Sequence, residues 1–324
     1  MADVRLEAAL NRAEPAIASA FREMIAVMSA SVPFRELARL IEAGDFEGAL
    51  ARTLQAAGRL PRAVNTQFIN AADNVAQQIG RRIGNIVIDF DNTSEFVVQA
   101  QRRNQLRLIQ GFTNQQRLAT RRALIDAQQR GLNPTETARV FRQSIGLTDR
   151  QMQAVINFRN SLENLSTDAL RRELRDGRFD RTILRAIDRG EPLSRTQIDR
   201  MVQRYSDRAL AHRARVIART EAQRAVNEGN QAMFDQAFAD GTLNRDGIIR
   251  EWNTALDERV RASHSSMHGQ TVGATTPFVS GQGNATQHPG GFGIAEEDIQ
   301  CRCTVGTRIT DLAIPGRVDV QVVG

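Results

Sequence analysis

"RMVQRYSDRALAHRARVIARTEAQRAVNEGNQAMFDQAFAD", residues 200–240, decides the fold class, because it predicts one long helix over about residues 200–239. Small and apolar residues recur every three or four positions, as on one face of a helix. They are Ala218, Ala222, Ala225, Val226, Gly229, Met233 and Ala237. Glu221 borders this stripe and has arginines as its obvious partners, while Gly241 is a suitable terminator.

Shorter helices precede this one. Residues 1 to about 85 form helical pieces broken at "SVP", "EAGD" and "GRLPR". Further along, three pairs of residues have the spacing of a capping box, which marks the start of a helix. The pairs are Asn133 with Glu136, Thr148 with Gln151, and Ser194 with Gln197.

Strand-like runs gather near the C-terminus. "IIREW" at 248–252 and the stretch through "CRCTVGTRI" and "RVDVQVV" are β-rich, a short helical segment is expected at 254–269, and 273–293 is a Gly-rich loop. One earlier run, "NIVIDFDN" at 85–92, is also β-rich. The sequence therefore predicts an α+β fold that is mainly α-helical, with a small strand-containing C-terminal unit.

Four linear segments follow from this pattern. A helical N-terminal region covers 1–90, an Arg-rich helical region 91–200, the long helix with the strand unit 201–310, and a short tail 311–324.

Composition narrows the function. The chain of 324 residues has a net charge of +6, and all 43 of its basic residues are arginine. Residues 101–150 hold ten arginines against three acidic residues, a local net charge of +7. Arginine suits bidentate contacts to phosphate, so non-specific binding of double-stranded DNA is expected, with Arg102, Arg103, Arg121 and Arg122 as candidate contacts. A solvated helical face is the alternative interpretation of the same charge run.

Neither a signal peptide nor a membrane span is expected. The N-terminal residues carry acids from position 3 onward, and nowhere do 18 apolar residues run together. Two cysteines in the whole chain do not suggest a disulfide-stapled secreted fold.

The histidines and cysteines of the C-terminal part raise a metal hypothesis. His264 and His268 are four apart and would share one face of a helix, whereas Cys301 and Cys303 are two apart and would share one face of a strand. Together they can form a closed structural zinc site, although this cysteine pair has one intervening residue where a zinc knuckle has two. A packed hydrogen-bonded cluster or a disulfide is the alternative, so no cofactor is the first expectation.

An ordered set of residues resembles the phage Mu F-like minor head protein family, also called phage head morphogenesis proteins. The set consists of Arg219, Thr220, Glu221, Trp252, Asp257, Arg261, His264, Gly269, Pro289, Gly290, Cys301, Arg302 and Cys303. The family commonly has Asp or a similar polar residue where this chain has His268, so no metal role for His268 follows from the resemblance.

The resemblance implies a low-copy bacteriophage protein without enzymatic activity. Its place would be the procapsid and virion, at the head interior or portal vertex, after assembly in the host cytoplasm. Its role would be head morphogenesis together with packaging or ejection of DNA, and its partners the portal protein, the major capsid protein and packaged double-stranded DNA.

Two other classes stay open. The first is a zinc- or His-dependent enzyme carried in the virion, a nuclease or transferase, with His264 as base or metal ligand and Glu221 as acid. No HExxH motif, phosphate-binding loop or nucleophile elbow supports it. The second is a DNA-binding protein outside the virion, but the sequence has no recognisable DNA-recognition helix.

Overall fold

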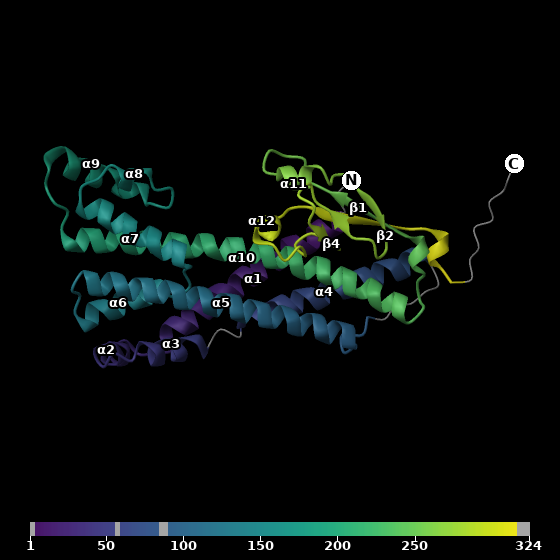
Figure 1. Ribbon diagram of the computed structural model, residues 1–324, viewed down its shortest axis with the longest axis horizontal. Helices are drawn as coiled ribbons and strands as arrows, with labels where there is room; N and C mark the ends of the chain where they lie inside the picture. The colour runs from purple at the N-terminus through teal and green to yellow at the C-terminus, as the bar shows by residue number, and fades with distance from the viewer. Residues whose placement is uncertain (1–3, 56–58, 84–89, 316–324) are drawn as a thin grey trace. The chain divides into compact units, whose positions relative to one another are not determined.

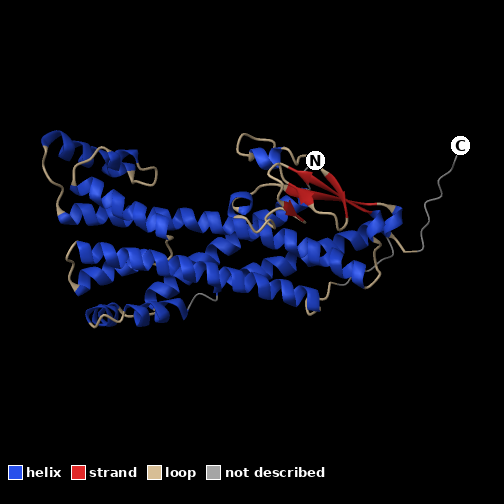
Figure 2. Ribbon diagram, viewed as in Figure 1, coloured by secondary structure: helices blue, strands red, loops and turns tan. Residues whose placement is uncertain are grey.

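The computed structural model describes residues 4–55, 59–83 and 90–315. Helices make up most of this part of the chain, and the strands follow the longest helix (Figure 2). The fold is therefore mainly α with a small β component, as the sequence predicts.

The helices before the strands begin and end as follows (Figure 1). They are α1 (Val4–Ala30), α2 (Phe34–Glu42), α3 (Phe46–Leu54), α4 (Arg59–Ile83), α5 (Glu95–Gln129), α6 (Pro134–Ser144), α7 (Asp149–Glu163), α8 (Asp168–Arg171), α9 (Asp180–Arg189) and α10 (Arg195–Ala239). A 3₁₀ turn, η2 (Gly177–Phe179), leads into α9. The predicted long helix is thus confirmed and starts five residues earlier than expected, at the Ser194 cap.

The C-terminal part contains two antiparallel sheets. Strands β2 (Thr271–Gly273), β1 (Ile248–Asn253) and β5 (Thr304–Ile309) pair in that order, with Trp252 opposite Val305. Strands β3 (Phe278–Val279) and β4 (Ala285–Thr286) form a separate hairpin. Short helical pieces lie between and around the strands: η3 (Arg245–Gly247), α11 (Ala262–Ser265), α12 (Ala295–Asp298) and η4 (Asp311–Ala313).

The chain forms two compact units, each built from separated segments. The first takes its described residues from Met1–Ala20, Leu60–Leu106 and Val216–Gly324, the second from Phe21–Arg59 and Arg107–Arg215. Helices α1, α5 and α10 each contribute to both, so the units do not coincide with the four linear segments expected from the sequence.

The second unit has a core between α7, α8, α9 and the first part of α10. Phe158 and Tyr205 stack there with ring centroids 4.6 Å apart, and Leu147, Met152 and Leu162 are almost fully buried. The segment 166–197, with its dense alternating charge, therefore also packs inward, through Ala169, Ile183 and Leu193.

The first unit has a tight crossing between α10 and α4. Gly229 lies so close to α4 that a Cβ atom there would stand 2.3 Å from the backbone oxygen of Phe68. The predicted stripe on α10 is buried throughout, and the polar residues Gln223, Arg224 and Asn227 between its members are buried as well. This half of α10 is consequently enclosed on several sides.

Two sequence expectations lie outside the described residues. The β-rich run at 85–92 falls largely on 84–89, and "RVDVQVV" falls on 317–323. The segment expected to be helical at 254–269 is mostly turns, with helix only at Ala262–Ser265.

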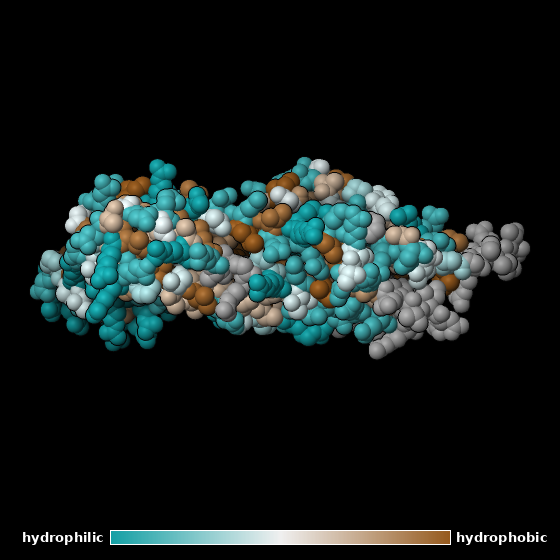
Figure 3. Space-filling model, turned by 90° about the horizontal axis from the view of Figure 1, so that it is seen from below, coloured by the Kyte–Doolittle hydropathy of each residue, from teal (hydrophilic) through white to brown (hydrophobic). Residues whose placement is uncertain are grey.

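The surface is largely polar. Figure 3 shows one face that is mainly hydrophilic, with apolar side chains in scattered patches. Among the described residues, no single helix has the length and apolar character to cross a membrane, although the bent pair Ala8–Ala30 and Phe34–Glu42 meets that criterion when taken together.

Candidate functional site

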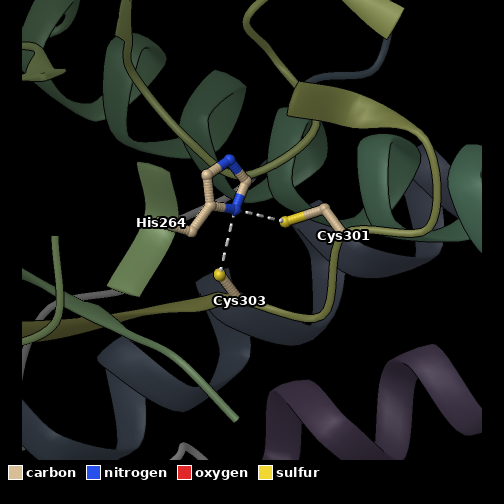
Figure 4. A group of neighbouring side chains, drawn as sticks. All are labelled: His264, Cys301 and Cys303. Carbon is tan, nitrogen blue, oxygen red and sulfur yellow. Dashed lines mark hydrogen bonds between the residues drawn. The ribbon is translucent and has the colours of Figure 1, made fainter. Parts of the chain in front are cut away.

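Three side chains converge in the first unit. His264 comes from α11, and Cys301 and Cys303 lie just before β5 (Figure 4). The Nδ1 atom of His264 is 3.6 Å from Sγ of Cys301 and 3.4 Å from Sγ of Cys303. All three residues are buried, and both cysteines are free. We call these residues the His–Cys cluster.

The second ring nitrogen of His264 faces a carboxylate. Its Nε2 atom is 2.9 Å from Oε2 of Glu297, on α12. Glu297 in turn accepts hydrogen bonds from Ser263 Oγ at 2.8 Å, Ser280 Oγ at 2.9 Å and Asn284 Nδ2 at 3.1 Å. The imidazole is therefore fixed between a carboxylate on one side and two sulfur atoms on the other.

Aromatic rings enclose the cluster. The His264 ring stacks on Phe292 with centroids 5.5 Å apart and meets the edge of Trp252 at 5.8 Å. Trp252 also packs against Phe278, and both are fully buried. The apolar surroundings exclude water and strengthen every polar contact within them.

The pKa values reflect this setting. The hydrogen bond from Cys303, followed by His264, lowers the pKa of Cys301 to about 5, while the same contact raises the pKa of Cys303. Burial pulls the pKa of His264 down, but Cys301 and Glu297 outweigh it and hold that pKa above its usual value. Burial raises the pKa of Glu297, yet its three hydrogen-bond donors keep it below the usual range. Negative charge is thus stabilised at Cys301 and Glu297.

Helix α10 holds the loops around the cluster through its buried polar face. Arg224 donates to Gly290 O at 2.7 Å and to Asp298 Oδ2 at 3.0 Å. Gln223 donates to the backbone oxygen of Cys303, and Thr220 Oγ1 accepts from the backbone N–H of Gln300 at 3.1 Å. One turn and a half of α10 therefore fixes both the Pro-Gly loop and the Cys-Arg-Cys segment.

A second set of contacts holds the outer side of the same segment. Arg302 pairs with Asp257, and Arg261 donates to the backbone oxygen of Ile299. The Arg302 guanidinium lowers the pKa of Asp257 below its usual range. Arg219 is exposed and, with Arg302, lines a small cavity of about 200 Å³.

The remaining glycines and proline of the predicted motif have backbone roles. Gly269 has φ of +76°, which only glycine adopts readily, and its N–H donates to Trp252 O at 2.8 Å. Gly290 has φ of +81° and lies against the backbone of Arg224, while Pro289 O contacts the ring of His288. These positions shape the loops that surround the cluster.

His268 is a correction to the sequence-based metal set. The chain leaves the helix after Ser265, so His264 and His268 do not share one helical face. Instead the backbone N–H of Thr254 donates to Nδ1 of His268 at 3.2 Å. Within the described residues, the group able to hold a metal is His264, Cys301 and Cys303.

Glu221 is also placed differently from the enzyme hypothesis. It is buried and pairs with Arg224 at 3.4 Å, as expected for a structural ion pair, whereas the carboxylate at His264 belongs to Glu297. The acid of the enzyme hypothesis, Glu221, is thus engaged with Arg224, and Glu297 is the carboxylate beside His264.

The four candidate DNA contacts differ in exposure. Arg102, Arg103 and Arg121 on α5 are exposed. Arg122 instead pairs with Asp149, to which its Nη2 atom donates at 2.7 Å, and also reaches Gln153. Its guanidinium is engaged within the second unit and is a poorer candidate for phosphate.

A known protein family matches the part of the chain that contains these contacts. The model described as "Phage Mu protein F like protein" matches residues 178–306. This region is therefore similar to the phage Mu F-like family. The Mu F-like region begins 23 residues before the segment 201–310 expected from the sequence and ends within it. It includes the whole His–Cys cluster and every residue of the predicted motif.

Two known proteins are similar in sequence to part of this chain. The minor head protein GP7 of Bacillus phage SPP1 is 31% identical over 110 residues, which is 34% of this chain and 34% of that protein. The NAD(+)–arginine ADP-ribosyltransferase EFV of Enterococcus faecalis is 33% identical over 88 residues, 27% of this chain and 17% of the transferase. The matches thus span about a third of the first relative and a sixth of the second. No solved structure matches the chain.

Several residues that organise the site were not identified from the sequence. Glu297, Asp298 and Arg224 are the main ones, and Ser263, Ser280 and Asn284 support Glu297. The acidic run "EED" at 296–298, just before the cysteines, is the feature of the sequence that points to Glu297 and Asp298. Its partners lie up to 74 positions away in sequence, so spacing alone could not identify them.

Proposed function

We propose that this chain is a bacteriophage minor head protein, present at low copy in the procapsid and virion, with a role in head morphogenesis. The observation that carries the proposal is the match of residues 178–306 to the phage Mu F-like family, and a partial similarity to a minor head protein of Bacillus phage SPP1 supports it. Assembly would take place in the host cytoplasm.

A structural role fits the contacts of the motif residues. Trp252 and both cysteines fill a core, and Thr220, Asp257 and Arg302 hold loops in place. Cys301, His264 and Glu297 are arranged like the nucleophile, the base and the orienting carboxylate of a catalytic triad. Each of these side chains is only about 1% exposed, so a substrate would have no access. This burial favours a structural role for the site over catalysis.

The transferase relative does not alter this proposal. The shared stretch is 17% of that protein, which leaves most of it without a counterpart here. We therefore do not extend a transfer reaction to this chain.

We further propose that exposed arginines contact packaged double-stranded DNA without sequence preference, and that the portal protein or the major capsid protein is the protein partner. Arg102 and Arg103 in the first unit and Arg121 in the second expose their side chains along α5. Inside a DNA-filled head, phosphate would be the most abundant partner for them, during packaging or ejection.

Incorporation into particles tests the main proposal. Quantitative mass spectrometry of purified procapsids and virions should detect the chain at far fewer copies than the major capsid protein. The chain expressed without other phage proteins should not sediment with the particle fraction. Absence of the chain from both procapsids and virions would overturn the proposal.

DNA binding is tested separately by its salt dependence. Log affinity for duplex DNA should fall with log salt concentration, by a slope of roughly 0.9 for each phosphate contacted. Changing Arg102, Arg103 and Arg121 to Gln should reduce that slope by up to about 3. Arg122→Gln is the matched control and should leave the slope unchanged, because Arg122 is paired with Asp149. An unaltered slope in the triple variant would mean that these arginines do not contact DNA and only form a solvated helical face.

A further inference from the structure

The His–Cys cluster has the donor set of a metal site. One imidazole nitrogen and two sulfur atoms lie within 4.8 Å of one another. In the part of the chain that the structure describes, these are the His, Cys, Asp and Glu side chains that come close enough together to hold a metal ion. Thiolate and imidazole are the ligands that zinc and other soft cations prefer.

The distances fit a tetrahedral ion. Zinc binds thiolate at about 2.3 Å and imidazole nitrogen at about 2.0–2.1 Å. In a tetrahedron these bond lengths place nitrogen and sulfur about 3.6 Å apart. The observed separations from His264 Nδ1 are 3.6 Å to Cys301 and 3.4 Å to Cys303. Both nitrogen–sulfur separations therefore match those between ligands of one zinc ion.

Hydrogen bonding alone explains this arrangement less well. The Nε2 atom of His264 faces Glu297, which leaves only Nδ1 for the two sulfurs. An imidazole nitrogen has one proton or one lone pair, so it can make one good hydrogen bond, not two. A hydrogen bond between the two cysteines would satisfy the second sulfur but would not require it to lie 3.4 Å from the same nitrogen, whereas a shared ion places both sulfurs at about this distance.

Glu297 supplies the second independent observation. A histidine that binds a metal almost always donates its other ring N–H to a carboxylate, a backbone carbonyl or water, which fixes the tautomer and the ring orientation. Glu297 lies 2.9 Å from Nε2, is 1% exposed, and is itself held by Ser263, Ser280 and Asn284. With the proton on Nε2, beside the Glu297 carboxylate, the lone pair of Nδ1 would be free for an ion shared with the two sulfurs.

We propose that His264, Cys301 and Cys303 bind one zinc ion, and that the ion has a structural role because the three ligands are buried. His264 lies 37 residues before Cys301 in sequence. The ion would therefore join α11 to the segment that leads into β5, across the intervening loops and the β3–β4 hairpin. Trp252, Phe278 and Phe292 would form its apolar shell. His268 has no part in the site.

Metal content of the purified full-length chain tests this proposal. Protein prepared without chelator should contain about one zinc per chain by elemental analysis. Removing zinc should lower the melting temperature, and adding Zn²⁺ alone should restore it. Co²⁺ added to the metal-free chain should give the visible bands of a tetrahedral site together with thiolate-to-cobalt charge transfer.

Variants separate the site from unspecific binding and from misfolding. Cys301→Ser and Cys303→Ser should each lose the zinc. Glu297→Gln keeps the side-chain shape and should stay folded while metal affinity falls by about 10- to 100-fold. His268→Ala is the matched control and should keep one zinc with unchanged affinity.

Two results would overturn the proposal. One is a folded wild-type chain that contains no zinc and takes up neither Zn²⁺ nor Co²⁺. The other is zinc that persists at the same stoichiometry in both cysteine variants, since it would then be bound elsewhere. Neither result bears on incorporation into phage particles, so this proposal and the proposed function can fail separately.

Discussion

Arg224 on α10 and Asp298 on α12 form a buried ion pair, with Nη2 of Arg224 3.0 Å from Oδ2 of Asp298. The same carboxylate accepts the backbone N–H groups of Phe292 and Gly293 at 3.0 and 2.8 Å. Arg224 also donates to Gly290 O. The pair thus joins the middle of α10 to the loop that surrounds the His–Cys cluster.

We expect Arg224→Met to destabilise the protein strongly. Methionine fills much of the same volume but leaves Asp298 buried with an uncompensated charge. Breaking a buried ion pair in this way typically costs about 3–5 kcal/mol. Urea denaturation followed by circular dichroism measures the change in the free energy of unfolding.

Arg219→Met is the control for this prediction. Arg219 lies five positions earlier on the same helix and belongs to the predicted motif, but it is exposed. Its replacement should change stability by no more than about 0.5 kcal/mol. Equal losses of unfolding free energy in the two variants would mean that the buried ion pair does not contribute more to stability than an exposed arginine.

Two glycines in long helices should respond in opposite ways to alanine. At Gly229 a Cβ atom would lie 2.3 Å from the Phe68 backbone oxygen, so Gly229→Ala must push α4 away and should destabilise by about 1–3 kcal/mol. At Gly111 on α5 a Cβ atom meets nothing within 4 Å. Gly111→Ala should therefore stabilise by about 0.5–1 kcal/mol, because alanine favours the helix. Thermal unfolding of both variants measures the sign of each stability change. A higher melting temperature for Gly229→Ala would contradict the close contact between α10 and α4.

Local features of the fold were predictable from the sequence. Asn133 with Glu136 and Thr148 with Gln151 form complete capping boxes at the starts of α6 and α7. Ser194 and Gln197 make both bonds of the same motif before α10. Each motif depends on residues three positions apart, so a reader of the sequence has all the necessary information.

Contacts between distant residues were not predictable in the same way. The interpretation of His264 and His268 as one helical face required a helix through both, but the helix ends at Ser265 and His268 meets Thr254. The carboxylate at His264 comes from Glu297, 33 positions later, and no periodicity connects the two. The resemblance to the family placed His264 and the cysteines in one motif, and the structure confirms that they lie together.

The last prediction concerns acid. The carboxylate of Asp176 caps η2 and is held by Arg178, with Arg208 at 3.6 Å. The hydrogen bond from Arg178 lowers the pKa of Asp176 well below its usual value of 3.8. In the unfolded chain this carboxylate takes up a proton near pH 3.8, whereas in the folded chain it does so only at lower pH. The stabilisation is therefore complete above pH 3.8 and is lost as the pH falls toward the folded-state pKa.

Asp176→Asn removes this titration and should separate its effect from other acid-sensitive groups. The variant should be less stable than the wild type at pH 7, and the difference between them should shrink as the pH is lowered below 3.8. Melting temperatures of both proteins across that range measure it. Asp188→Asn, an exposed position on α9, is the control and should change stability at pH 7 by no more than about 0.5 kcal/mol. A difference between Asp176→Asn and the wild type that stayed constant from pH 7 to the lowest pH would show that the charge of Asp176 is not what stabilises this turn.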